Sequence, residues 1–246
     1  MTKILGIIPS RFASTRLPGK PLLKIGHETM IQRTYNQCIK CGLLANVVVA
    51  TDDSQIFDHV KSFGGNVIMT STEHQSGTDR CFEAFTKFGG DYDYVINIQG
   101  DEPFILPQQI EILAKLLDGT IEIATLVKKI ENYEILTNEN VPKVTLTKNN
   151  DAIYFSRQTI PFIRDVEKAN WLNHNTFYKH LGIYAYRVDV LGQITKLAPS
   201  TLELAEKLEQ LRWLENGFKI KVGISPYDTI GVDTQEDLER AREIQL

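Results

Sequence analysis

The chain has 246 residues, of which 42% are hydrophobic and 24% charged, and its formal net charge is −4. This length suffices for one large domain or two small ones, and the mild acidity argues against nucleic acid as a partner, because nucleic-acid-binding surfaces are usually basic. No apolar run reaches the roughly 18 residues that a membrane span needs. Met1–Lys3 leads directly into a strand-like run, so we predict no signal peptide, no membrane partner and a cytoplasmic location.

Short apolar runs alternate with helical patterns through the first half of the chain. The valine and isoleucine residues of these runs are continuous, which indicates strands buried on both faces, as in a parallel sheet. In chain order we expect strands near 4–8, 46–53, 66–70 and 93–103, and helices near 30–43, 54–63 and 78–88. Such alternation indicates βαβ units. The predicted fold is therefore an open, doubly wound, mostly parallel α/β sheet, with ligands bound outside the carboxyl ends of its strands.

The second half of the chain has a different pattern. IATLVKKI, KVTLTKNNDAIYFSR and HLGIYAYRVDVL predict longer strands, and we interpret residues from about 136 to 187 as a β-rich extension of the sheet. A loop is expected near 170–178, followed by a helix over 202–216 and a closing strand, KIKVGIS. Without a repeat or linker, we expect a single domain over 1–246. Cys38 and Cys41 form a CxxC inside a helical pattern, and we predict buried thiols there.

The segment after the first predicted strand, PSRFASTRLPGKPL, carries three cations, Arg11, Arg16 and Lys20. Small residues in the same segment, including Ser10, Ser14, Thr15 and Gly19, allow backbone N–H groups to turn inward, and such nests bind phosphate when Arg and Lys are added. The segment is neither GxxxxGK[ST] nor GxGxxG. A solvated basic turn is the alternative, but Pro18 and Pro21 stiffen the segment, so a triphosphate site is favoured.

Two aspartates far apart in the sequence predict a Mg²⁺ site. Asp101 and Glu102 directly follow the run VINIQ, at the end of a strand, where Mg²⁺ can be held by a few carboxylates together with phosphate oxygens. These acids could instead begin a helix near 107–117. Asp233 precedes TQED, a capping box that accounts for Thr234 and Asp237 but not for Asp233. Asp101 and Asp233 are therefore the predicted metal ligands.

Two further clusters suggest ligand contacts. Ser76, Thr78 and Arg80 lie in SGTDR, at the start of a helix whose free N–H groups attract anions or carbonyl groups, although a plain N-cap explains the serine or threonine equally well. Arg157 and Arg164, with His180 and Tyr184 in HLGIYAY, could form a pocket for a carboxylate and hydroxyls.

In order and spacing, several motifs resemble the family of 3-deoxy-manno-octulosonate (KDO) cytidylyltransferases, also called CMP-KDO synthetases. They are IPSRFASTRLPGKPL, ATDD, HQSGTDR, NIQGDEP, YFSRQTIP, HLGIYAYR, LEQLRWLENG and GVDTQEDLERAR, and together they cover nearly the whole chain. The sequence differs from the common pattern at Ser10, often alanine, and at Gln235, often proline. The resemblance implies a nucleotide-diphospho-sugar transferase fold and transfer of CMP from CTP to KDO with Mg²⁺, for lipopolysaccharide biosynthesis. It also implies a homodimer with the β-rich extension at its interface.

The resemblance also implies a role for each site residue. The nucleotide would be bound by Ser10, Arg11, Arg16, Lys20, Ser76, Thr78, Arg80 and Gln99. The sugar would be bound by Arg157, Arg164, His180, Tyr184, Glu209 and Gln210. Lys20, Arg16 and Asp101 would be catalytic, and Asp101 with Asp233 would hold the metal. The sequence identifies no general base, for which Asp101 is our hypothesis. The alternatives are transfer to another acid sugar, such as amino-KDO or sialic acid, and a metal-dependent glycosyltransferase.

Overall fold

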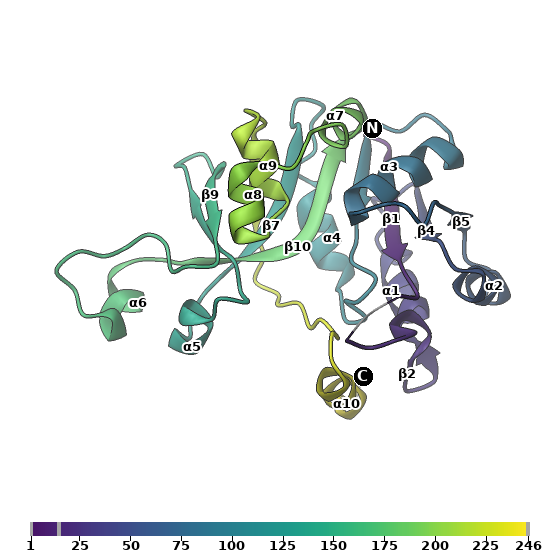
Figure 1. Ribbon diagram of the computed structural model, residues 1–246, viewed down its shortest axis with the longest axis horizontal. Coiled ribbons are helices and arrows are strands. Elements are labelled where there is room, and N and C mark those ends of the chain that lie inside the picture. The colour runs from purple at the N-terminus through teal and green to yellow at the C-terminus, as the bar shows by residue number, and fades with distance from the viewer. Residues whose placement is uncertain (1, 14–15, 245–246) are drawn as a thin grey trace. The chain divides into compact units, whose positions relative to one another are not determined.

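The computed structural model describes residues 2–13 and 16–244, so Ser14 and Thr15 of the basic loop lie outside the described residues. It divides into two compact units (Figure 1). The first unit comprises Met1–Ala114 with Thr229–Leu246, and the second comprises Lys115–Asp228. The β-rich segment predicted near 136–187 falls inside the second unit.

The first unit contains the parallel sheet that the sequence predicts. Its strands lie in the order β6 (Tyr94–Asn97), β1 (Ile4–Ser10), β4 (Asn46–Thr51) and β5 (Val67–Met69), and every neighbouring pair is parallel. The residues of β6 are all buried, as are nearly all of those in β1 and β4, because helices cover the sheet on both faces. Strand β6 is shorter than the predicted run because QGDEP leaves the sheet as a turn.

Polar side chains fix where most helices of the first unit begin. Thr29 caps α1 (Met30–Cys38), Asp53 caps α2 (Ser54–Ser62) and Ser76 caps α3 (Gly77–Phe88), each by accepting hydrogen bonds from backbone N–H groups. The remaining helix of this region is α4 (Pro107–Ala114). Helix α1 ends earlier than predicted, and Cys38 and Cys41 are buried free thiols, as expected. Because β5 leads back across β4 and β1 to β6, a right-handed connection places α3 on the face opposite α1 and α2.

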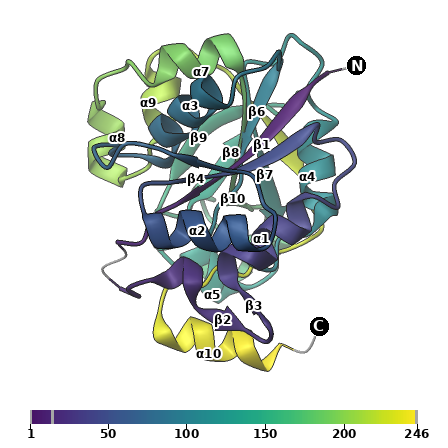
Figure 2. The same cartoon turned by 90° about the vertical axis from the view of Figure 1, so that its right-hand side faces the viewer.

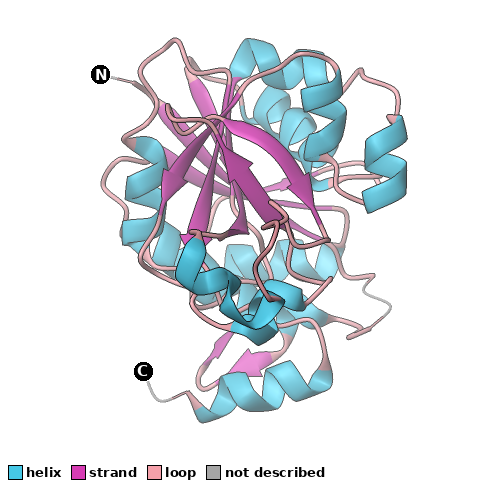
Figure 3. Ribbon diagram, turned by 90° about the vertical axis from the view of Figure 1, so that its left-hand side faces the viewer, coloured by secondary structure: helices cyan, strands magenta, loops and turns pink. Residues whose placement is uncertain are grey.

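The C-terminal segment packs against the loop that follows β1. Helix α10 (Gln235–Glu243) lies beside the small hairpin of β2 (Lys24–Ile25) and β3 (Glu28–Thr29), as Figure 2 and Figure 3 show. One hydrophobic cluster holds these parts together, and it consists of Leu17, Ile25, Met30, Phe104, Val232, Leu238 and Ala241. Burial of these apolar side chains holds Val232 and helix α10 against the loop that follows β1.

The second unit is built on strands that are mostly antiparallel. Strand β7 (Ile123–Lys129) pairs with β10 (Tyr178–Arg187) in antiparallel fashion and with β11 (Ile220–Ile224) in parallel. Strand β8 (Lys143–Leu146) pairs in antiparallel fashion with β10 and with β9 (Ala152–Ser156). The register of β10 against β7 shifts between Leu181 and Tyr184, which marks a bulge. Of these strands, β8, β9 and β10 lie within the segment predicted to be β-rich.

Two predictions for the helices of the second unit are wrong. The single helix expected over 202–216 is two helices, α8 (Thr201–Glu206) and α9 (Gln210–Glu215), because Lys207 has the left-handed φ of 54° and ends the first. The loop expected near 170–178 contains α6 (Trp171–His174), preceded by the 3₁₀ turn Lys168–Asn170, because Trp171 is buried against Phe177.

The other helices of the second unit are α5 (Tyr133–Thr137) and α7 (Val188–Ile194). Within residues 2–13 and 16–244, no helix combines the length and apolar character that crossing a membrane requires.

Candidate active site

A cavity of about 370 Å³ opens at the carboxyl ends of β1 and β6, in the first unit. It is lined by Pro9, Ser10, Arg11, Ala13, Arg16, Lys20, Pro21, Gly77, Arg80, Gln99, Gly100, Asp101 and Asp233. The cavity therefore lies where an open parallel sheet binds its ligands. Of the residues predicted to contact the nucleotide or metal, only Ser76 and Thr78 are absent from the lining, and both flank Gly77 at the start of α3.

Lys20 joins the two predicted metal ligands. Its ammonium donates to Asp101 Oδ2 at 2.7 Å and to Asp233 Oδ1 at 3.0 Å. The Lys20 side chain is only 13% exposed, so burial lowers its pKa, but attraction and hydrogen bonds from both carboxylates outweigh burial and raise that pKa above its usual value. Lys20 is therefore protonated at neutral pH, between two carboxylates that converge on one point.

Local backbone geometry positions these three side chains. Gly19 has a left-handed φ of 66° and precedes the 3₁₀ turn Lys20–Leu22, which directs Lys20 into the cavity. A Cβ at Gly100 would lie 2.8 Å from the carbonyl oxygen of Pro9, so only glycine allows the turn after β6 to approach the end of β1 so closely. The backbone N–H of Val232 donates to the carbonyl of Asp101 at 2.9 Å, which places Asp233 beside Asp101.

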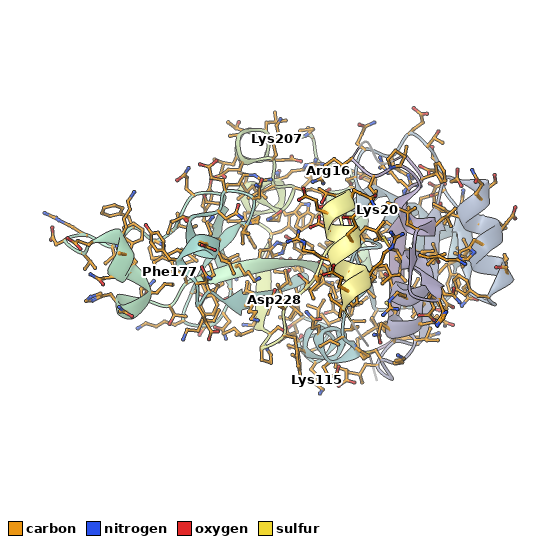
Figure 4. The ribbon with its side chains drawn as sticks, turned by 90° about the horizontal axis from the view of Figure 1, so that it is seen from below. Arg16, Lys20, Lys115, Phe177, Lys207 and Asp228 are labelled. Atoms are coloured by element: carbon orange, nitrogen blue, oxygen red, sulfur yellow. The ribbon has the colours of Figure 1, made fainter. Side chains whose placement is uncertain are left out.

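These contacts decide between the alternatives for the two acids. Asp101 turns toward Lys20 rather than capping α4; just before α4, the backbone N–H of Leu106 donates to the side-chain oxygen of Gln109 at 3.0 Å. Thr234 and Asp237 form the predicted capping box of α10. The Asp233 carboxylate remains outside that box and pairs with Arg16 at 3.2 Å. Figure 4 shows the side chains of Arg16 and Lys20.

Two further guanidinium groups border the cavity from the α3 side. Arg11 donates to the carbonyl oxygen of His74. Arg80 is fully buried, and its terminal nitrogens donate to Asp52 at 2.6 Å and to the hydroxyl of Thr70. Burial lowers the pKa of Arg11, and the nearby charge of Arg80 lowers it further, against the opposing effect of Asp52 and Asp79. Two like charges held this close create an attractive position for an anion.

The remaining predicted nucleotide contacts are small polar groups. Ser76 is the N-cap of α3 and forms a capping box with Asp79, so its capping role is confirmed. Thr78 is buried in the first turn of α3, and Gln99 lines the cavity. The hydroxyl of Ser10 also faces the cavity from the end of β1, and among the described residues this buried oxygen has no hydrogen-bond partner. A polar ligand would satisfy it.

The second unit brings together several of the predicted sugar residues. His180 and Tyr184 lie on β10 with ring centroids 5.0 Å apart, and Tyr184 packs edge-on against Trp213 of α9 at 5.1 Å. Glu209 lies at the start of α9. Burial raises the pKa of Tyr184, and the negative charge of Glu209 raises it further. Gln210 is buried on the same helix. Within the described residues, neither its amide nitrogen nor the Tyr184 hydroxyl has a hydrogen-bond partner.

The two predicted sugar-site arginines have different surroundings. Arg157 adjoins the turn between α8 and α9, where its guanidinium donates to the backbone carbonyls of Glu206 at 2.6 Å, Glu139 at 3.1 Å and Lys207 at 3.4 Å. Arg164 is 89% exposed and pairs with its neighbour Asp165 at 3.5 Å. The structure therefore does not bring Arg164 to His180 and Tyr184, and the sugar-binding role of each arginine stays a prediction.

Asp52 and His74 hold cavity arginines but were not selected from the sequence. Asp52 follows β4 in ATDD, so its place at a strand end was a usable signal. His74 contributes its backbone carbonyl to Arg11, a role that residue type does not reveal.

The histidine of β10 gives the second unit a predicted acid sensitivity. His180 Nε2 lies 2.9 Å from the Thr125 hydroxyl, which itself donates to the Ile183 carbonyl at 2.7 Å, so Nε2 carries the proton of a neutral ring. Burial lowers the pKa of His180 from 6.5 to about 3. The unfolded chain therefore takes up a proton that the folded chain does not, and stability is lost as the pH falls from 6.5 toward 3.

Because of this histidine, we expect the free energy of unfolding to fall by about 1–2 kcal/mol between pH 7 and pH 5. Urea unfolding at pH 7, 6 and 5 measures the loss, and His180→Gln should flatten it. The exposed His27, replaced by glutamine, is the matched control and should leave the pH dependence unchanged. Equal slopes for the wild type and His180→Gln would contradict the assignment.

Comparisons with known proteins agree with this site. A family model described as cytidylyltransferase matches residues 5–220. The 3-deoxy-manno-octulosonate cytidylyltransferase of Bacteroides thetaiotaomicron is 58% identical over 245 residues, covering 98% of this chain and 97% of that protein. The protein of the same name from Cytophaga hutchinsonii is 56% identical over 238 residues, covering 96% and 95%.

Solved structures give the same result. A CMP:2-keto-3-deoxy-manno-octonic acid synthetase complexed with CTP superimposes with a TM-score of 0.91 at 40% identity, covering 98% of this chain and 97% of that one. A cytidylyltransferase from Leptospira borgpetersenii, at 18% identity and a TM-score of 0.65, shares the fold. The resemblance seen in the sequence motifs is thus confirmed, and the chain belongs to the cytidylyltransferase family, as one of its 3-deoxy-manno-octulosonate cytidylyltransferases.

Proposed function

We propose that this chain transfers CMP from CTP to the anomeric hydroxyl of KDO and releases pyrophosphate, a step that supplies activated KDO for lipopolysaccharide. The observation that carries the proposal is the convergence of Arg11, Arg16 and Lys20 with Asp101 and Asp233 on one cavity at the strand ends. Its relatives carry the name of that activity. The reaction is an in-line attack on the α-phosphorus, which depends mainly on positioning and on charge neutralisation.

The cavity cations would bind the triphosphate. Lys20, whose side chain is 13% exposed, would neutralise charge near the α-phosphate, and Arg16, at 65% exposed, would reach the outer phosphates. Ser10, Arg80 and Gln99, together with the α3 start at Ser76 and Thr78, would surround the base and ribose. In the second unit, the sugar acid would be bound by His180, Tyr184, Glu209, Gln210 and Arg157.

The carboxylates of this cavity fit Mg²⁺. Asp101 and Asp233 already hold one cation, the Lys20 ammonium, between oxygens within 3.0 Å of it, and carboxylate oxygens are the ligands that Mg²⁺ takes. Among the described residues no three His, Cys, Asp or Glu side chains gather as a metal cluster. A bound Mg²⁺ would therefore share phosphate oxygens and water with these two aspartates. When bound, it would offset phosphate charge and lower the pKa of the attacking hydroxyl.

A pyrophosphate-release assay with Mg²⁺ tests the function directly. Purified protein is offered CTP, UTP, ATP and GTP, each with KDO, amino-KDO, sialic acid or a hexose 1-phosphate. We expect strong release only with CTP and KDO. Release with CTP and another acid sugar would replace the sugar assignment and keep the chemistry, whereas no release with any pair would overturn the function.

We further infer that the protein acts as a homodimer in the cytoplasm, where CTP is available. The second unit exposes apolar side chains that line one pocket, Tyr133 at 40% and Phe162 at 70%, next to the buried Trp171. Apolar surface of this kind favours burial against a partner. Light scattering should give twice the mass of one chain, and Phe162→Asp should lower the measured mass toward that of a single chain. A monomeric wild type would contradict this inference.

A further inference from the structure

One carboxylate on α3 holds the segment that leads into the cavity. Glu83 Oε2 accepts a hydrogen bond from the backbone N–H of Ser71 at 2.8 Å and pairs with His74 Nε2. Its other oxygen pairs with Lys87 at 2.6 Å, one turn further along the same helix. Glu83 thus connects the rigid helix to both ends of the turn 71–74.

The charge state of Glu83 is fixed by these contacts. Burial raises its pKa, but the hydrogen bonds from Lys87, the Ser71 N–H and His74 outweigh burial and lower the pKa to about 2. Glu83 is therefore a carboxylate throughout the physiological range. Hydrogen bonds to an ionised acceptor are the stronger kind, and here two of the three donors come from outside the helix. Pairing of Glu83 with Lys87 would not by itself bring the Ser71 N–H and the His74 imidazole to this carboxylate.

The turn that Glu83 holds supports a cavity cation. The carbonyl of His74 accepts the hydrogen bond of Arg11, which lines the cavity. Because Arg80 repels Arg11, the Arg11 side chain needs such an acceptor to remain in its place when no anion is bound. Thr70, just before the turn, is fixed independently by its N–H bond to the Thr51 carbonyl at 2.8 Å and by Arg80. The part of the segment that depends on Glu83 is the turn itself.

We infer that Glu83 is a positioning residue for CTP binding: through Ser71 and His74 it holds the carbonyl that aims Arg11 into the nucleotide cavity. This inference rests on the proposed function, which it deepens. Glu83 does not line the cavity, and its effect reaches the nucleotide only through Arg11. Its loss should therefore weaken nucleotide binding while leaving the sugar site and the phosphoryl-transfer step largely intact.

Steady-state kinetics of Glu83→Ala test the inference. We expect KM for CTP to rise about tenfold, the effect of losing a charge-assisted hydrogen bond that orders a binding group. Both kcat and KM for KDO should stay within about twofold of wild type, because the transition-state contacts are retained. Glu83→Gln should recover most of the affinity, since the amide oxygen it introduces still accepts from the Ser71 N–H.

Asp93→Ala is the matched control. It removes a carboxylate that accepts from the Lys3 backbone N–H at 2.7 Å, at the amino ends of β1 and β6. Its melting temperature should fall without any change in KM for CTP. If Glu83→Ala behaves in the same way, Glu83 is structural only and the inference is wrong.

A second variant covers the case in which Glu83→Ala does not fold. His74→Ala removes the imidazole and keeps the carbonyl, so it should also raise KM for CTP while leaving kcat within about twofold of wild type. An unchanged KM for CTP would overturn the inference. Wild-type protein in the same assay separates the two proposals: an inactive wild type rejects the function, whereas an active wild type with unaffected variants rejects only the role of Glu83.

Discussion

Asp101→Asn is expected to lower kcat for pyrophosphate release by on the order of 10³ or more while leaving the fold intact. The substitution keeps the shape of the side chain and removes its charge. It therefore weakens the predicted Mg²⁺ site and removes the negative charge from the closer of the two partners of Lys20, at 2.7 Å. Asp233→Asn, which alters the partner at 3.0 Å, should act in the same direction. Initial rates at saturating CTP, KDO and Mg²⁺ measure both variants.

The control for this prediction is Asp58→Asn on the exposed face of α2, which should keep wild-type kcat. Circular dichroism and thermal melting establish that each variant folds. Near-full turnover by a folded Asp101→Asn variant would show that neither the metal assignment nor the general-base hypothesis holds for this residue. A high rate restored by raised Mg²⁺ alone would retain the metal role and remove the general-base role.

Lys20→Ala should lower kcat by on the order of 10² or more, as expected when a preorganised charge at the transition state is lost. The Lys20 side chain is 13% exposed, and its protonated state is secured by two carboxylates. Its removal also leaves Asp101 and Asp233 facing one another without the ammonium between them. We therefore expect a lower melting temperature as well, which CTP with Mg²⁺ should partly restore.

Lys24→Ala is the matched control, because Lys24 is exposed on the neighbouring strand β2 and does not line the cavity. Its kinetics should equal those of the wild type. If Lys20→Ala raises only KM for CTP and leaves kcat unchanged, Lys20 contributes equally to ground state and transition state, and its catalytic role is rejected in favour of binding.

The sequence predicted the first unit well because its signals there are local. Continuous apolar runs mark β1, β4 and β6, and capping residues such as Asp53 and Ser76 mark helix starts, so element type follows from neighbouring residues. The predictions of secondary structure were wrong where burial of one side chain or one backbone angle determines which element forms. Lys207 splits one periodic pattern into two helices, and Trp171 draws an apparently irregular stretch into a helical turn.

The site was predicted as a set of residues rather than as a geometry. Strand ends and residue chemistry were enough to select Arg11, Lys20, Asp101 and Asp233. The sequence could not show that a fully buried Arg80 is committed to Asp52 and Thr70, or that the guanidinium of Arg157 donates to backbone carbonyls. These hydrogen bonds depend on which acceptors lie within reach of each guanidinium after folding.

By itself, the sequence determined the fold class, the family and the chemical character of the first loop, because strand pattern, motif order and charge are all written along the chain. Only the tertiary structure decided that Lys20 lies between Asp101 and Asp233, which are 81 and 213 residues away from it. Burial of Leu17, Val232 and Leu238 in one cluster brings the last helix to the first loop. The same is true of Glu83, whose connection to Arg11 passes through a backbone carbonyl that no residue type encodes.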